Sequence, residues 1–170
     1  MKPLLSIGGL CCLLSVVTWA FNIPTVNFAG IWIRDNNKVE GMNTPLPDLT
    51  WIITQDDNQF SIEQVGSFKS PPKEVYNLDG TQKITEITDS HPPRTITRSA
   101  KWLNDGQVLE LTTLSVSRGD SVTKPITFVV KDQLELAEGG NVLRVRRTVS
   151  IPDLGSSVKI QEIKFIFYKK

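Results

Sequence analysis

Hydrophobic and polar residues alternate along most of the chain beyond residue 20, and helical spacing of apolar positions is almost absent. Alternation at period two is typical of strands that bury one face. Runs rich in Val, Ile, Thr and aromatic residues therefore predict strands. The predicted strands span residues 30–34, 49–55, 60–65, 74–78, 82–88, 94–103, 107–116, 126–131, 134–137, 142–150 and 158–168.

Short turn segments separate many of these runs. They are Asp56-Asp57-Asn58, Asp79-Gly80, Asn104-Asp105-Gly106 and Glu138-Gly139-Gly140-Asn141. Asn, Asp and Gly are the residues that tight hairpins favour. Parallel pairing would need much longer crossovers. The sequence therefore predicts that consecutive strands pair antiparallel.

The predicted fold class is all-β. So many antiparallel strands in a short chain would expose long edges unless the sheet closes on itself. An antiparallel meander closing as a β-barrel is the expected architecture, and a two-sheet β-sandwich is the alternative. No internal repeat or linker divides the chain, so residues 21–170 are expected to form a single domain.

The first twenty residues have the pattern of a secretory signal peptide. Lys2 precedes an uncharged, mostly apolar run, and a small residue, Ala20, closes it. This pattern predicts cleavage after Ala20 and an exported protein, periplasmic or secreted, that starts at Phe21. A membrane anchor or an acylated Cys11 is the alternative, but the run is shorter than the roughly 20 apolar residues of a membrane span.

Removal of this segment changes the composition. Both cysteines, Cys11 and Cys12, lie within it, so the remaining 150 of 170 residues contain no thiol. Of 19 basic and 18 acidic residues, only Lys2 is lost, which leaves 18 of each sign. A balanced charge without a basic block excludes the usual electrostatic signature of nucleic-acid binding. A chain of this length can bury a sufficient core without disulfides.

Catalytic and metal-binding patterns are weak. The only histidine, His91, precedes Pro92-Pro93 in a predicted loop. A zinc site needs three or four His, Cys or carboxylate ligands, and a serine-type triad needs a histidine placed between a nucleophile and an acid. The sequence therefore predicts a protein that is not an enzyme and needs no metal or cofactor.

Period two also predicts which charged side chains face inward. Arg98 alternates in phase with Ala100 and Trp102, and Arg147 alternates in phase with Val145. A guanidinium stays charged at any relevant pH, so each needs a partner. That partner is either a buried carboxylate, with Glu86 and Glu110 as the candidates, or the anionic group of a ligand.

Three Pro-rich stretches, 42–48, 66–73 and 90–93, interrupt the strands and are expected to be loops. In the last predicted strand the apolar phase switches between Ile160 and Ile163, which predicts a bulge near Gln161-Glu162.

Several segments resemble a known family. They are Asn27-Phe28-Ala29-Gly30-Ile31-Trp32, Tyr76-Asn77-Leu78-Asp79-Gly80, Thr97-Arg98-Ser99-Ala100-Lys101-Trp102, Leu109-Glu110-Leu111-Thr112-Thr113 and Leu143-Arg144-Val145-Arg146-Arg147-Thr148-Val149. In order and spacing they resemble secreted bacterial proteins with a lipocalin-like, calycin-type barrel. The resemblance implies that Gly30 and Trp32 are structural. It also implies that Trp32 packs across the closed end, with Arg146 or Arg147 over its ring.

Two functions are compatible with this pattern. In the first, the barrel holds a small apolar or anionic ligand, and Arg98, Arg147 and Trp102 are the expected binding residues. In the second, the barrel is solid and acts as an envelope or extracellular interaction module that binds a protein partner through the Pro-rich loops. Phe60, Phe68 and Tyr76, if exposed, would then be the anchors. The volume of the interior cavity discriminates between the two functions.

Overall fold

A computed structural model describes residues 26–66, 71–118, 124–154 and 159–170. The predicted signal peptide lies outside the described residues. The strands are β1 (Gly30–Arg34), β2 (Thr50–Gln55), β3 (Gln59–Val65), β4 (Glu74–Asn77), β5 (Lys83–Ile87), β6 (Arg94–Leu103), β7 (Val108–Ser117), β8 (Ile126–Ala137), β9 (Val142–Ser150) and β10 (Lys159–Lys169). The described residues contain no α-helix, only three short 3-10 helices: η1 (Asn36–Lys38), η2 (Glu138–Gly140) and η3 (Pro152–Leu154).

All ten strands belong to one antiparallel sheet with the order β4-β3-β2-β1-β10-β9-β8-β7-β6-β5. The first strand of the chain pairs with the last, with Trp32 opposite Lys169 and Arg34 opposite Phe167. This ladder confirms the predicted meander and removes one edge from both strands. The described ladders join every neighbouring pair except β4 and β5, so the barrel is nearly closed. The gap between these two strands is called the seam below.

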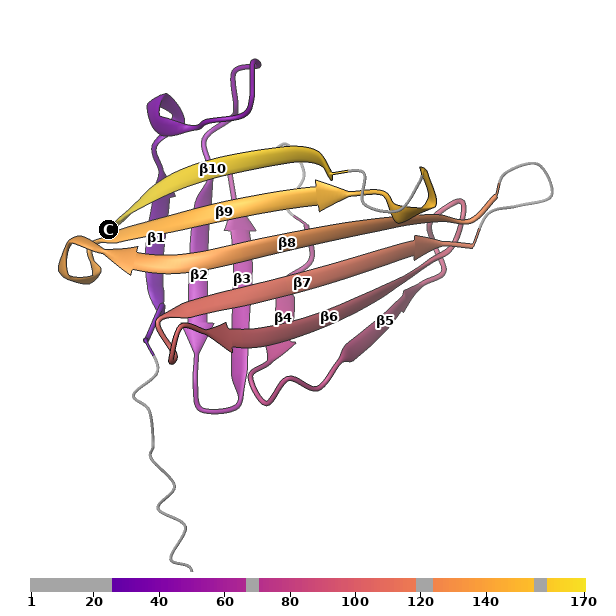
Figure 1. The fold of residues 1–170 in the computed structure, drawn as a ribbon, viewed down its shortest axis with the longest axis horizontal. Helices are drawn as coiled ribbons and strands as arrows, with labels where there is room; N and C mark the ends of the chain where they lie inside the picture. The colour runs from indigo at the N-terminus through magenta and orange to yellow at the C-terminus, as the bar shows by residue number, and fades with distance from the viewer. Residues whose placement is uncertain (1–25, 67–70, 119–123, 155–158) are drawn as a thin grey trace, which may run out of the picture.

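Figure 1 shows how one sheet forms two walls. Strands β1–β4 run across the back of the molecule, and β5–β10 cross them at the front. The two walls meet where β1 pairs with β10. The barrel prediction is therefore confirmed, and the alternative of two separate sheets is wrong, because a continuous ladder links both walls.

Short hairpins and longer connections lie at opposite ends of the barrel. Successive antiparallel strands turn at opposite ends, and the tight hairpins β2–β3, β4–β5, β6–β7 and β8–β9 all lie at one end (Figure 1). In the β6–β7 hairpin, Asn104 and Asp105 adopt positive φ angles of 48° and 51°, which the sequence Asn-Asp-Gly tolerates well. The three Pro-rich stretches belong to β1–β2, β3–β4 and β5–β6, at the opposite end. We call this opposite end the open end.

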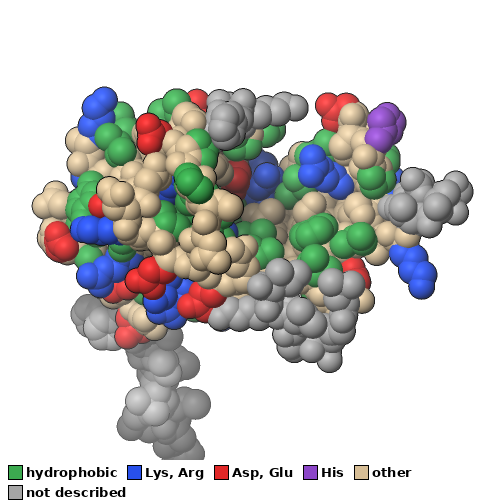
Figure 2. Space-filling model, turned by 90° about the horizontal axis from the view of Figure 1, so that it is seen from above, with side chains coloured by type: hydrophobic (Ala, Val, Ile, Leu, Met, Phe, Trp, Pro, Cys, Tyr) green, Lys and Arg blue, Asp and Glu red, His purple; other side chains and the backbone are tan. Residues whose placement is uncertain are grey.

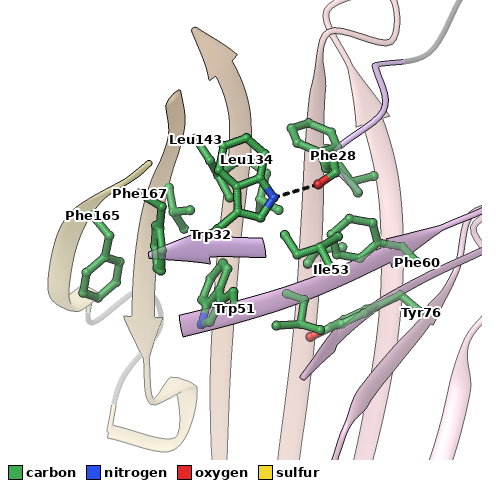
Figure 3. Packing of buried hydrophobic residues seen from close by; sticks show 14 of the residues in the cluster. Phe28, Trp32, Trp51, Ile53, Phe60, Tyr76, Leu134, Leu143, Phe165 and Phe167 are labelled. Atoms are coloured by element: carbon green, nitrogen blue, oxygen red, sulfur yellow. Dashed lines mark hydrogen bonds between the residues drawn. The ribbon is translucent and has the colours of Figure 1, made fainter. Parts of the chain in front are cut away.

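The closed end holds the apolar core. Phe28 and Trp32 are fully buried there, and the Trp32 indole N–H donates to the Phe28 carbonyl at 2.8 Å (Figure 3). The amide of Val26 donates to the Gly106 carbonyl at 3.1 Å, which ties the chain entering β1 to the β6–β7 hairpin. The other buried core residues include Trp51, Ile53, Phe60, Ile62, Leu109, Leu134, Leu143 and Phe167.

One strand prediction is wrong and one irregularity is confirmed. Residues 126–131 and 134–137 form a single strand, β8, because Asp132 and Gln133 continue the ladder to β9 without a break. The polar pair looks like an interruption in the sequence, yet Asp132 faces the interior. In β10 the register shifts between Lys159 and Gln161, which confirms the bulge predicted near Gln161.

The long β1–β2 connection extends the barrel wall at the open end. Beyond the end of β1, Glu40 and Lys164 exchange two backbone hydrogen bonds of 3.1 Å. Their side chains also form an ion pair at 2.7 Å. Gly41 follows with φ of 85°, and a Cβ there would lie 2.1 Å from the Glu162 carbonyl oxygen. Only glycine allows the connection to lie this close to β10.

Candidate functional site

Polar side chains meet inside the barrel, where the apolar core ends. The Tyr76 hydroxyl donates to Glu74 at 2.7 Å and contacts the Thr113 hydroxyl at 2.9 Å. The Gln64 amide donates to the same Glu74 carboxylate at 3.1 Å. These contacts join β3 and β4 to β7, so Tyr76 bridges the seam near the closed end.

Tyr76 is a fixed donor in this arrangement. It is 1% exposed. Burial, and then the neighbouring Glu74 charge, raise the pKa of the Tyr76 hydroxyl well above its ordinary value. The hydroxyl therefore keeps its proton and gives it to Glu74. Because a hydroxyl donates one hydrogen, Thr113 is the donor in its own contact with Tyr76.

An ion pair completes this group. Arg147 donates to Asp132 from Nε and from a terminal nitrogen, both at 2.7 Å. The Asp132 side chain is 7% exposed and that of Arg147 is 28% exposed. We call Gln64, Glu74, Tyr76, Thr113, Asp132 and Arg147 the polar layer.

The partner of Arg147 corrects the sequence prediction. The expected carboxylates were those of Glu86 and Glu110. Glu86 instead pairs with Arg118 at 2.8 Å near the surface, and Glu110 accepts a hydrogen bond from Gln133 at 2.9 Å. The sequence did not indicate Asp132 as the partner, because this residue lies between two predicted strands and alternation therefore did not place its side chain on either face of the sheet.

The pair fixes the charge of Arg147. Burial opposes the charge, but the attraction and hydrogen bonds of Asp132 outweigh it and raise the pKa of Arg147. The guanidinium also lies 5.7 Å from the centre of the Phe165 ring. Arg34 lies at the same distance from that ring. The Arg34 Nε donates to the Asn36 side chain at 2.8 Å, and a terminal nitrogen of Arg34 donates to the Pro47 carbonyl.

A cavity of about 580 Å³ lies along the seam. We call it the seam cavity. Its apolar lining is Pro71, Pro72, Val75, Ile87 and Ile96, and its charged lining is Lys73, Glu74, Lys83, Glu86, Asp89, Arg94 and Arg98. Figure 2 shows the molecule hollowed between two masses, with basic and acidic side chains inside the hollow. Glu74 belongs both to this lining and to the polar layer.

Arg98 is the lining cation of this cavity whose charged group has a buried, unpartnered atom. It lies opposite Thr113 in the β6–β7 ladder, so the inward phase places it beside the polar layer. Its Nε atom is buried without a hydrogen-bond partner. Among the described residues, no carboxylate lies within ion-pair distance of its guanidinium. A buried donor on a permanent charge is costly unless an acceptor meets it.

The structure separates Trp102 from Arg98. Four residues along one strand correspond to roughly 13 Å, and Trp102 stacks on Phe28 at 6.1 Å towards the closed end. It does not line the seam cavity. Trp32 is buried as predicted, but the cation over its ring is Lys169 at 5.5 Å rather than Arg146 or Arg147. Arg146 points outward and Arg147 is turned to Asp132 and Phe165.

The expected protein-binding anchors lie elsewhere. Phe60 and Tyr76 are buried in the core, so neither can anchor a partner. Phe68 lies outside the described residues. His91 is exposed in the β5–β6 connection. The sequence analysis did not single out Glu74, and it considered Tyr76 only as an exposed anchor. Their shared inward position on the short strand β4 is the one signal that the alternation offers.

Among the residues that the structure describes, no group of three His, Cys, Asp or Glu side chains is placed to hold a metal ion. No helix among those residues has the length and apolar character to cross a membrane.

Comparison with known proteins gives a structural neighbour and no family. No protein-family model matches the chain, and no curated protein matches it. A solved structure described as a "REP1-NXSQ fatty acid transporter" superposes with a TM-score of 0.49 at 15% identity. The match covers 84% of this chain and 95% of that one. The ladders themselves form the nearly closed antiparallel barrel.

Proposed function

We propose that this protein is an exported, non-catalytic binding protein that takes a small amphipathic ligand with an anionic head group into the open half of its barrel. The observation that carries the proposal is Arg98, a cation with a buried, unpaired Nε beside a cavity of about 580 Å³. That volume lies within the range of ligand pockets, roughly 300–1,000 Å³.

The charges around the polar layer support an anionic head group. Asp132 neutralises Arg147, and Arg34 is occupied by the β1–β2 connection. Glu74 accepts hydrogen bonds from Gln64 and Tyr76. Among the described residues no carboxylate forms an ion pair with Arg98, whose buried Nε has no partner. A carboxylate matches its planar guanidinium with two parallel hydrogen bonds. Ile87, Ile96 and Val75 supply apolar contacts for the rest of such a ligand.

Arg98→Gln is expected to weaken binding of a straight-chain carboxylate at least tenfold. The loss of a charge-assisted, partly desolvated hydrogen bond accounts for this size. The measurement is isothermal titration of the purified protein with straight-chain carboxylates of increasing length and with the matching alcohols. Wild-type protein should prefer the carboxylates, and Arg98→Gln should bind both classes alike.

The matched control is Arg146→Gln, which removes an arginine from the outer face. Its affinity should stay within twofold of wild type. Arg98→Gln should also leave the melting temperature of ligand-free protein unchanged or higher, because the unpaired charge contributes no stabilising contact. Equal binding of carboxylates by wild type and Arg98→Gln, or no binding by wild type, would refute the proposal.

N-terminal sequencing of the mature protein tests the proposed export. Lys2, the apolar run and Ala20 support a signal that is removed during secretion. Sequencing of the protein recovered from its own host should give Phe21 as the first residue. Recovery of intact Met1, or of an acylated Cys11, would contradict this part of the proposal.

A further inference from the structure

Lys83 is a second cation beside Arg98. The β5–β6 ladder sets the two residues directly opposite each other, so their side chains project from the same, inner face of the sheet. Both line the seam cavity. The strand that carries Lys83, β5, is the last strand of the sheet and pairs with β6 alone (Figure 1). One wall of the cavity therefore carries two positive charges on neighbouring strands, roughly 5 Å apart at the backbone.

Like charges directly opposite each other are destabilising unless something neutralises them. The described ladders also contain directly opposite pairs of unlike charge: Asp132 with Arg147, Lys101 with Glu110, and Glu135 with Arg144. A second like-charged pair is Arg146 with Lys164, but Lys164 also forms an ion pair with Glu40 at 2.7 Å. Lys83 and Arg98 are thus the like-charged pair of the described sheet in which neither member has a carboxylate partner.

The other side chains of the cavity do not supply the missing negative charge. Four basic and three acidic side chains line it. Of the acids, Glu86 is paired with Arg118 at 2.8 Å, Glu74 is bound by neutral donors, and Asp89 lies beyond the far end of β5. None of the three forms an ion pair with Lys83 or Arg98. The cavity therefore has an excess of positive charge beside the β5–β6 ladder.

A doubly negative head group matches both cations. A carboxylate carries one charge, and two parallel hydrogen bonds to the Arg98 guanidinium would leave Lys83 unmatched. A phosphate monoester carries roughly 1.5–2 negative charges at neutral pH and has three strong acceptor oxygens. It can therefore accept from a guanidinium and an ammonium group at once, and lysine binds phosphate as a point charge.

We propose that the head group of the ligand is a phosphate monoester that bridges Lys83 and Arg98. This inference rests on the proposed function and specifies its ligand class as amphipathic phosphate monoesters. The apolar chain keeps the contacts with Val75, Ile87 and Ile96 that line the same cavity. Lys83 is then the residue that distinguishes a doubly negative head group from a singly negative one.

The test compares an alkyl phosphate with the alkyl sulfate of the same chain length, because the two head groups are both tetrahedral and differ in charge. The full chain, processed by its host, is titrated at about pH 8, where a phosphate monoester is almost fully dianionic. The alkyl chains are short enough to remain monomeric. The wild-type protein should bind the phosphate about tenfold more tightly than the sulfate, the effect of one further charge-assisted hydrogen bond.

Inorganic phosphate is the third ligand of the test. It carries the head group without the chain, so it gains nothing from the burial of apolar surface. Its affinity should be lower than that of the alkyl phosphate by at least about tenfold.

Lys83→Met should reduce the preference for phosphate over sulfate to about twofold or less. Affinity for the sulfate should stay within about threefold, because the exposed Lys83 acts on a single charge through screened attraction. Lys83→Arg keeps the charge and should retain most of the preference. The melting temperature of ligand-free Lys83→Met should be unchanged or higher, because the substitution removes a contact between like charges.

Lys101→Met is the matched control. Lys101 is an exposed lysine on the same strand as Arg98, but it lies on the outer face opposite Glu110 and does not line the cavity. Lys101→Met should keep the wild-type preference for the alkyl phosphate.

The outcomes separate the two proposals. If the sulfate and a carboxylate of the same chain bind through Arg98 but the phosphate binds no more tightly, the head-group inference is wrong and the proposed function stands. The same holds if the preference survives in Lys83→Met. If inorganic phosphate binds as tightly as the alkyl phosphate, the chain contributes nothing and both proposals fail. Both also fail if no amphipathic anion binds the wild-type protein.

Discussion

Replacing Arg147 with methionine should destabilise the folded protein by about 3–5 kcal/mol. The substitution leaves the Asp132 carboxylate, whose side chain is only 7% exposed, without its counter-charge and without two hydrogen bonds of 2.7 Å. Urea denaturation at neutral pH, followed by tryptophan fluorescence, gives the change in unfolding free energy from the midpoint and slope.

The reciprocal change should cost less. In Asp132→Leu the guanidinium of Arg147 keeps its contact with Phe165 and, being 28% exposed, can reach water. The double variant Asp132→Leu/Arg147→Met should recover most of the loss, because it removes both charges together. The cycle of four proteins yields the coupling energy of the pair. A double variant no more stable than Arg147→Met would show that the pair is not the cause of the loss.

Replacing Trp32 with alanine should also destabilise the protein by about 3–5 kcal/mol. Trp32 is fully buried where β1 lies between β2 and β10, and its removal leaves a large cavity in the closed end. The substitution also removes the indole N–H that donates to the Phe28 carbonyl at 2.8 Å, and the ring that lies under the Lys169 ammonium group. Thermal unfolding followed by circular dichroism measures the effect.

Two further variants calibrate that result. Trp32→Phe keeps much of the buried area and loses the N–H, so it should cost about 1–3 kcal/mol. Ile84→Ala lies on β5, where the side chain is 63% exposed, and should change stability by no more than about 0.5 kcal/mol. If Trp32→Ala were as stable as Ile84→Ala, the conclusion that Trp32 is a major contributor to core stability would be wrong.

The contrast between the two inner arginines bears on the proposed function. Arg147 is paired with Asp132, whereas Arg98 has no such partner and is, under the proposed function, the arginine that binds the ligand's anionic group. Proteins commonly keep a destabilising group where binding requires it. The sequence presents both arginines in the same way, as charges in phase with apolar neighbours.

The amino-acid sequence by itself determined the local features. Period-two alternation placed strands close to their observed bounds, and Asn104-Asp105-Gly106 marked a tight hairpin correctly. The phase switch after Ile160 indicated the irregularity in β10. Each of these depends on a few neighbouring residues, since strand alternation and turn geometry are local properties of the backbone.

Only the tertiary structure decided which inward side chains meet. Asp132 and Arg147 are partners because the β8–β9 ladder sets them opposite each other, and Tyr76 reaches Thr113 because the curved sheet brings β4 across the seam to β7. Closure places Lys169 rather than an arginine over Trp32. Such contacts depend on the register and curvature of the whole sheet, which no short stretch of alternating residues encodes. For the same reason, the unmet donors of Trp51 and Arg98 become visible only in the folded barrel.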